Sequence, residues 1–203
     1  MRTIAMLMKS LLSVVALFAA FAASAESGSP EDLVKSTSDE VLSVIRQTTD
    51  RQKLQQLAQE KVVPHFDFQR MTQLAVGRAW RQATPDQQRQ LQEQFRELLV
   101  RTYTNAMAAG THGNAKIQMK PSPGAPKGGE AIVRTQAVEP GKPPIAIDYY
   151  MEQKPDGWKV YDVTVDSVSL VTNYRSQFDS TVSQSGIDGL LRSLTEKNKA
   201  QAK

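Results

Sequence analysis

Hydrophobic and polar residues alternate with two periodicities along the chain, that of a helix in the first half and that of a β-strand after it. In the first half, apolar residues recur every three or four positions, which predicts amphipathic helices beginning near Ser29, Asp50, Asp67 and Thr84. The helix from Thr84 gives the strongest signal, because Thr84 and Gln87 form a capping box ahead of a long apolar stripe. We expect this helix to lie at the surface with one side buried.

From about Ala115 the pattern changes to alternation, which is typical of β-strands. Three or four strands separated by Gly and Pro turns fit the stretch to Asp166. Because such closely spaced strands are joined by short turns, the pattern predicts an antiparallel meander. One face of the third strand is nearly free of charge. That face is predicted to carry Ile145, Ile147, Tyr149 and Met151, and the other face Ala146, Asp148, Tyr150 and Glu152.

Helical spacing resumes at Leu170 and is interrupted at Ser185 and Gly186, so we expect two final helices. The last residues, Lys197 to Lys203, are polar and are expected to fray. Helices first, a meander next and helices last predict the α+β class, with helices packed on one face of a curled antiparallel β-sheet.

The N-terminus has the features of a secretory signal peptide. Basic residues precede an apolar run from Leu11 to Phe21, and the small residues Ala23, Ser24 and Ala25 follow it. The run is too short to cross a bilayer, which requires about 20 apolar residues. We therefore expect residues 1–25 to be removed, leaving residues 26–203 as one soluble, exported domain of 203 − 25 = 178 residues.

Composition excludes several classes of function. Lys and Arg number 25 against 21 Asp and Glu, and loss of the two basic residues of the signal peptide leaves 23 against 21, a net charge of +2. The basic residues are dispersed rather than clustered on one face, which argues against nucleic-acid binding. With no cysteine and only His65 and His112 as histidines, the chain offers neither a three-histidine zinc site nor a thiol nucleophile. We predict no metal, no cofactor and no catalytic residue.

Two other interpretations remain open at this point. Asp148, Asp162 and Asp166 lie close in sequence to tyrosines of the predicted sheet, an arrangement that suits an acid/base isomerase or hydratase on a small α+β cone. We favour the simpler interpretation, in which Asp148 and Asp162 lie on a solvated sheet face and Asp166 leads into the last helices. A periplasmic chaperone that shields apolar segments of other proteins is the second alternative.

Several segments together resemble the MlaC family, also called the toluene-tolerance or ABC-transporter auxiliary family. The resemblance extends from roughly Ser29 to Leu194. It is carried by the segments 67–80, 83–88, 95–103, 158–163, 168–178 and 186–190. Members of this family are soluble periplasmic phospholipid-binding components of the system that maintains outer-membrane lipid asymmetry.

The resemblance implies a cone-like fold whose internal apolar pocket takes the tails of a diacyl phospholipid. It also implies two partners, an inner-membrane ABC transporter complex with a substrate-binding ring and an outer-membrane lipoprotein–porin complex. The function expected is that of a periplasmic carrier that shuttles lipid between them. We expect the pocket wall to be formed by Leu98, Leu99, Tyr103, Ile147, Tyr149, Met151, Val163, Val165, Leu170, Val171 and Tyr174.

Overall fold

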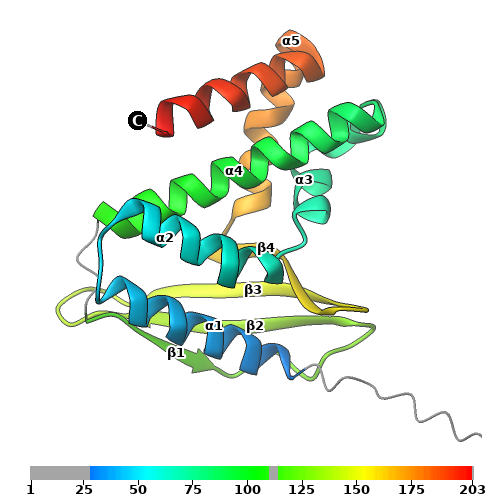
Figure 1. Ribbon diagram of the computed structural model, residues 1–203. Coiled ribbons are helices and arrows are strands. Elements are labelled where there is room, and N and C mark those ends of the chain that lie inside the picture. The colour runs from blue at the N-terminus through cyan, green and yellow to red at the C-terminus, as the bar shows by residue number, and fades with distance from the viewer. Residues whose placement is uncertain (1–27, 110–113, 203) are drawn as a thin grey trace, which may run out of the picture.

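A computed structural model describes residues 28–109 and 114–202 (Figure 1). The predicted signal peptide, residues 1–25, lies outside the described residues. The α-helices are α1 (Pro30–Ile45), α2 (Arg51–Leu57), α3 (Phe68–Val76), α4 (Pro85–Ala109) and α5 (Leu170–Gln201). Shorter helical turns are η1 (Ala58–Val62), η2 (Val63–His65) and η3 (Gly77–Arg81). The strands are β1 (Lys116–Lys120), β2 (Glu130–Val138), β3 (Ile145–Lys154), β4 (Gly157–Val165) and β5 (Val168–Ser169). This arrangement confirms the predicted α+β class.

The helices begin where the sequence predicts, because polar side chains satisfy the free N–H groups of their first turns. The Ser29 hydroxyl accepts from the N–H of Asp32, and a carboxylate oxygen of Asp67 accepts from the N–H of Arg70. The predicted capping box is present: the N–H of Gln87 donates to Thr84 Oγ1 at 3.2 Å, and the N–H of Thr84 donates to Gln87 Oε1 at 2.9 Å. Local sequence therefore sets the starts of α1, α3 and α4.

The sheet is an antiparallel meander in the order β1-β2-β3-β4-β5. The pairing places Ile147 opposite Val165 and Tyr149 opposite Val163, so the predicted apolar face of β3 continues across β4. A bulge between Tyr150 and Met151 shifts the register, and Met151 pairs with Val160. We call the face that carries Ile147, Tyr149 and Met151 the inner face. The sequence does not predict β5, which has only two residues.

The last helix confirms one prediction and corrects another. Gly186 has a non-helical conformation (φ 69°, ψ −174°), which divides α5 into two helical halves at the predicted position. The prediction that the chain frays from Lys197 is wrong, because helix continues to Gln201. The side-chain amide of Asn198 donates to the backbone carbonyl of Gln94 at 2.9 Å, and Gln201 Nε2 donates to Thr102 Oγ1 at 3.0 Å. These contacts dock the end of α5 on α4.

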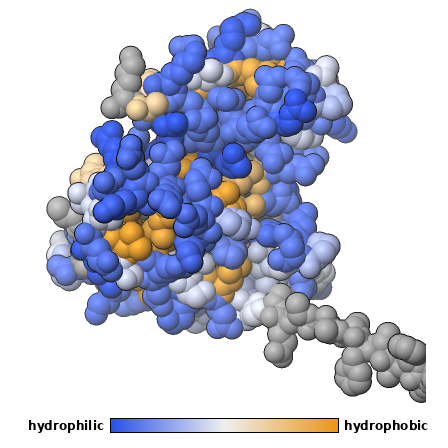
Figure 2. Space-filling model, in the orientation of Figure 1, coloured by the Kyte–Doolittle hydropathy of each residue, from blue (hydrophilic) through white to orange (hydrophobic). Residues whose placement is uncertain are grey.

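The elements form two layers, a sheet and a group of helices above it (Figure 1). α1 packs against the sheet, while α3, α4 and α5 contact one another. Apolar side chains come to the surface between the helices and the sheet (Figure 2). Within residues 28–109 and 114–202, no helix is long and apolar enough to cross a membrane.

Candidate functional site

The buried apolar residues fall into two clusters rather than one core. The helical cluster is built from α3, α4 and α5 around Met71, Leu91 and Phe95, all of which are fully buried. The sheet cluster is built from α1 and the inner face around Val133 and Met151. Phe66, between α2 and α3, packs against both. The fold therefore has two buried apolar clusters, one on the helices and one on the sheet, with Phe66 in contact with both.

The predicted wall residues divide between these two clusters. Leu98, Leu99, Val171 and Tyr174 belong to the helical cluster or pack against it. Met151, Val163, Ile147, Tyr149, Val165 and Leu170 belong to the sheet cluster or pack against it. Tyr103 is 37% exposed and is assigned to neither cluster.

The two clusters meet at the first turn of α5. Leu170 packs against the sheet cluster, whereas its neighbour Val171 is buried in the helical cluster. Adjacent helical residues point in directions about 100° apart, so this one turn presents a side chain to each layer. The start of α5 is therefore where the layers adjoin.

Three of the predicted wall residues are tyrosines that stay neutral. Burial, and then the neighbouring Tyr174, raise the pKa of Tyr103 to about 12. Burial also raises the pKa of Tyr174, opposed by a hydrogen bond with Thr102. It raises the pKa of Tyr149 as well, opposed by hydrogen bonds with Ser38 and then Thr135. Because none of these hydroxyls ionises near neutral pH, they add hydrogen-bonding capacity to the apolar surface without adding charge.

The sequence-based wall omitted β2, although β2 contributes to the same face. Val133 is fully buried and pairs with Tyr149, and Thr135 pairs with Ile147 and donates to its backbone carbonyl at 3.0 Å. Alternation along β2 already separates Val133 and Thr135 from Arg134. What the sequence lacked was the register that places these two residues beside Tyr149 and Ile147.

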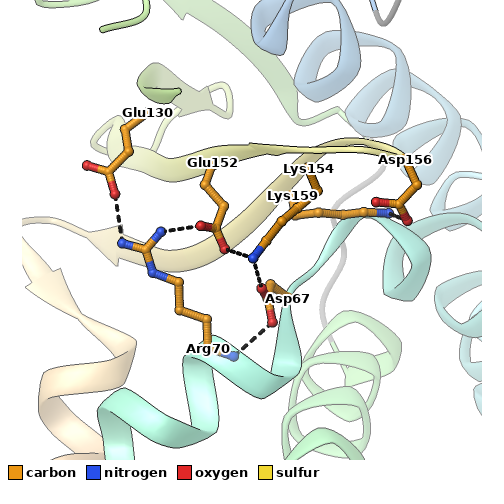
Figure 3. Close-up of polar contacts among 7 residues, drawn as sticks. All are labelled: Asp67, Arg70, Glu130, Glu152, Lys154, Asp156 and Lys159. Carbon is orange, nitrogen blue, oxygen red and sulfur yellow. Dashed lines mark hydrogen bonds and ion pairs between the residues drawn. The ribbon is translucent and has the colours of Figure 1, made fainter. Parts of the chain in front are cut away.

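A cluster of ion pairs joins α3 to the sheet (Figure 3). Arg70 Nη1 lies 2.6 Å from Glu152 Oε2, and Arg70 Nη2 lies 2.7 Å from Glu130 Oε1. The guanidinium carbon also lies 3.5 Å from the centre of the Tyr161 ring. Lys154 bridges Glu152 and Asp67 at 2.8 and 3.1 Å. We call this cluster the Arg70 clasp.

Further contacts between the layers also lie along β4. The N–H of Asp67 donates to the carbonyl of Val160 at 2.9 Å, and Lys159 Nζ donates to the carbonyl of Pro64 at 2.7 Å. These bonds and the Arg70 clasp fix the helices relative to the sheet at the end near the turn from β3 to β4. They thereby set how the two apolar clusters stand with respect to each other.

Each of the three aspartates considered for acid/base chemistry forms a hydrogen bond or an ion pair within the fold. Asp162 accepts from the N–H of Val171 at 3.1 Å and from the Ser169 hydroxyl at 2.6 Å, so it anchors the start of α5 to β4. Asp148 lies 3.6 Å from the Nε of Arg134. Asp166 Oδ1 accepts from the N–H of Ala146 at 3.0 Å. These contacts give each carboxylate a structural role.

The surface also contains a cleft that lies apart from the predicted wall residues. A cleft of about 560 Å³ lies between the first turns of α1 and the turn from β3 to β4, and its lining includes Asp32, Lys35, His65 and Trp158. None of the eleven predicted wall residues lines it. Among the described residues, no three His, Asp or Glu side chains are grouped so as to hold a metal ion.

Comparison with known proteins shows what the chain is similar to. It is 25% identical over 191 residues to the toluene tolerance protein ttg2D of Pseudomonas putida, an alignment that covers 91% of this chain and 86% of that protein. It is also similar to the solved structure of a phospholipid-binding protein from Ralstonia solanacearum in complex with a phospholipid. That match has a TM-score of 0.79 and 38% sequence identity, and it covers 87% of this chain and 100% of the other.

The family comparison agrees with both matches. The family model described as MlaC protein matches residues 35–196, which include every element from most of α1 to most of α5. The match contains all eleven predicted wall residues and the whole Arg70 clasp. The chain therefore belongs to the MlaC protein family.

Proposed function

We propose that this protein is a periplasmic phospholipid carrier that holds the acyl tails of a diacyl lipid between its helical cluster and its sheet cluster. The observation that carries the proposal is the 38% identity, over the whole of the matched chain, to a structure that contains a phospholipid. The division of the apolar residues into two clusters supports it, because tails can lie between two apolar surfaces.

The energetics of lipid transfer explain the need for such a carrier. Burying one methylene group gains about 0.8 kcal/mol, so exposing two sixteen-carbon tails to water costs on the order of 25 kcal/mol. Apolar walls offset most of this cost without distinguishing head groups. We therefore expect selectivity for the tails to exceed selectivity for the head group. No catalytic step is required for this function, and we propose none.

The proposed wall comprises the eleven predicted residues together with Val133 and Thr135 of β2. The eleven residues lie in or against the two apolar clusters, apart from Tyr103. Tyr103 is linked to the site through Tyr174, whose proximity contributes to its raised pKa. The predicted signal peptide, residues 1–25, supports a periplasmic location.

The partners we propose are those that the MlaC resemblance implies, an inner-membrane ABC transporter complex with a substrate-binding ring and an outer-membrane lipoprotein–porin complex. A carrier that binds two acyl chains tightly releases them slowly by itself. Membrane partners are therefore expected to drive the handover of lipid.

Native mass spectrometry of protein purified without detergent tests the proposal. We expect a mass increase equal to a diacyl phospholipid. Ile147→Glu places a charge on the inner face and should abolish lipid retention, whereas Ile132→Glu should not, because Ile132 lies on the opposite face of the neighbouring strand and is similarly half-buried. Circular dichroism checks that both variants fold.

Other results would contradict the carrier. Equal lipid retention by the two variants would show that the inner face does not line the site. Wild-type protein that contains no lipid, with or without vesicles present, would refute the proposal. A stoichiometric peptide in place of lipid would favour the chaperone alternative.

A further inference from the structure

In the part of the chain that the structure describes, few large apolar side chains are exposed, and two of them lie at the same end of the sheet. Within residues 28–109 and 114–202, the exposed large apolar side chains are Tyr103 (37%), Ile145 (43%) and Val168 (60%). We call these three residues the apolar rim. A single exposed apolar residue is ordinary, but a group of them at one place indicates a contact surface.

Strand pairing places Ile145 and Val168 on the inner face, at the same end of the sheet. Directly paired residues of antiparallel strands point to the same face. Val168 pairs with Val165, and Val165 pairs with Ile147, whose neighbour on that face is Ile145. Two hydrogen bonds between Ala146 and Asp166 hold the start of β3 beside the turn that precedes Val168. The rim therefore continues the inner face outwards.

Tyr103 belongs to the same region of the molecule. It lies close enough to Tyr174 to influence its ionisation, and Tyr174 is one helical turn after Leu170, near Val168 in the chain. α4 ends above the end of the sheet where β3 begins (Figure 1). The three rim residues thus border the proposed lipid site at one end.

The turn that precedes Val168 has an unusual backbone conformation. Asp166 and Ser167 both have positive φ values, 46° and 68°, which are unfavourable for residues other than glycine. Two consecutive left-handed residues give the tight hairpin turn that returns the chain for β5. Val168 follows this turn directly and is the most exposed of the three rim residues. Strain that persists in a fold is often associated with function.

We propose that the apolar rim inserts into the surface of a phospholipid bilayer, so that the carrier contacts membrane lipid directly. This inference goes beyond the proposed carrier function and rests on it, because the rim is continuous with the proposed lipid site. The size of the rim favours a bilayer over a protein partner: a stable protein interface uses about 20–30 residues on each side, whereas the rim has three. A few inserted side chains suit brief, reversible binding.

The residues around the rim also suit a membrane surface. Tyrosine is enriched where membranes meet water, because its ring is apolar and its hydroxyl is polar. Lys116 is exposed at the start of β1, in the strand row next to the one that contains Ile145. Lys142, in the turn between β2 and β3, is exposed as well, and its ammonium group pairs with Glu139 at 2.9 Å. Exposed lysines beside an apolar surface attract the phosphates of lipid head groups.

The absence of cysteine from the chain allows a site-specific test. Ile145→Cys and Val168→Cys each provide one attachment point for a polarity-sensitive dye at the rim. Gln153→Cys is the matched control, because Gln153 is exposed on the same face of the same strand but at the opposite end. Each labelled protein, first loaded with lipid as checked by native mass spectrometry, is mixed with vesicles of phosphatidylethanolamine and phosphatidylglycerol.

We expect a blue shift of emission at positions 145 and 168 but not at position 153, and loss of this shift when the vesicles are removed by centrifugation. A shift that persists in the vesicle-free supernatant would report lipid inside the carrier and would overturn the bilayer contact. Equal shifts at all three positions would indicate non-specific adsorption and would also overturn it. No shift in a lipid-loaded protein would refute the inference and leave the carrier function intact.

Discussion

The Arg70 clasp makes a quantitative prediction about what fixes the helices to the sheet. Arg70→Met keeps much of the side-chain volume but removes the charge. It breaks two ion pairs of similar length, 2.6 Å to Glu152 and 2.7 Å to Glu130. The two partners differ in exposure, because the Glu152 side chain is 17% exposed and the Glu130 side chain is 53% exposed. The ion pair with Glu152 should therefore be the stronger one.

The expected magnitudes follow from these environments. An exposed ion pair contributes about 0.2–1 kcal/mol, so we expect at most this coupling between Arg70 and Glu130. Charge-assisted hydrogen bonds in less solvated positions contribute about 1.5–3 kcal/mol. Lys154 still neutralises Glu152 when Arg70 is replaced, so we expect the Arg70–Glu152 coupling near the lower end, about 1.5 kcal/mol. Loss of the stacking on Tyr161 adds about 0.5–1 kcal/mol.

Urea unfolding of lipid-free protein, followed by circular dichroism, provides the measurement. Two double-mutant cycles are compared, one that combines Arg70→Met with Glu152→Gln and one that combines it with Glu130→Gln. We expect Arg70→Met to lower the free energy of unfolding by about 2–3 kcal/mol. A coupling to Glu130 that equals or exceeds the coupling to Glu152 would refute the reasoning. So would a cost of Arg70→Met below about 0.5 kcal/mol, which is the value for an ordinary surface substitution.

Three further predictions concern other parts of the fold. Burial lowers the pKa of His65, so the folded state favours the neutral imidazole. The free energy of unfolding should therefore fall as pH drops below about 6.5. Urea unfolding of His65→Gln should show that this part of the pH dependence is lost. Gly77→Ala should destabilise the fold by about 2 kcal/mol and Gly141→Ala by about 1 kcal/mol. Both glycines have positive φ, but only at Gly77 would the added methyl group lie about 3.3 Å from a neighbouring side chain, that of Arg175. Equal losses of thermal stability in the two variants would contradict this. Met151→Ala should lower the free energy of unfolding of lipid-free protein by about 2–5 kcal/mol, because Met151 is fully buried, and a cost below about 1 kcal/mol would show that the site is loosely packed.

The proposed site could be predicted only in part from the sequence. Alternation identified the apolar side chains of β3, and helical spacing identified Leu98 and Leu99 on α4. The contribution of Val133 and Thr135 was missed, because it depends on which residues of β2 stand opposite Tyr149 and Ile147. Register is set by packing and turn geometry across the whole sheet, and no local pattern in β2 specifies it.

The sequence by itself determined the types of the elements and most of their boundaries. Caps such as Ser29 and Thr84 act within four residues, and alternation acts between neighbours, so these signals can be seen in short windows. They do not reveal that Arg70 meets Glu130, 60 residues away, and Glu152, 82 residues away.

Only the tertiary structure decides which apolar residues belong to the helical cluster and which belong to the sheet cluster. Leu170 and Val171 look alike in the sequence, but one packs on the sheet and the other on the helices. The C-terminal residues are a second example. Their polar character predicts fraying, but hydrogen bonds from Asn198 and Gln201 to α4 hold this end of α5 in place. Contacts of this kind form only when distant segments are brought together, because their free energy depends on the complete packing arrangement rather than on local sequence.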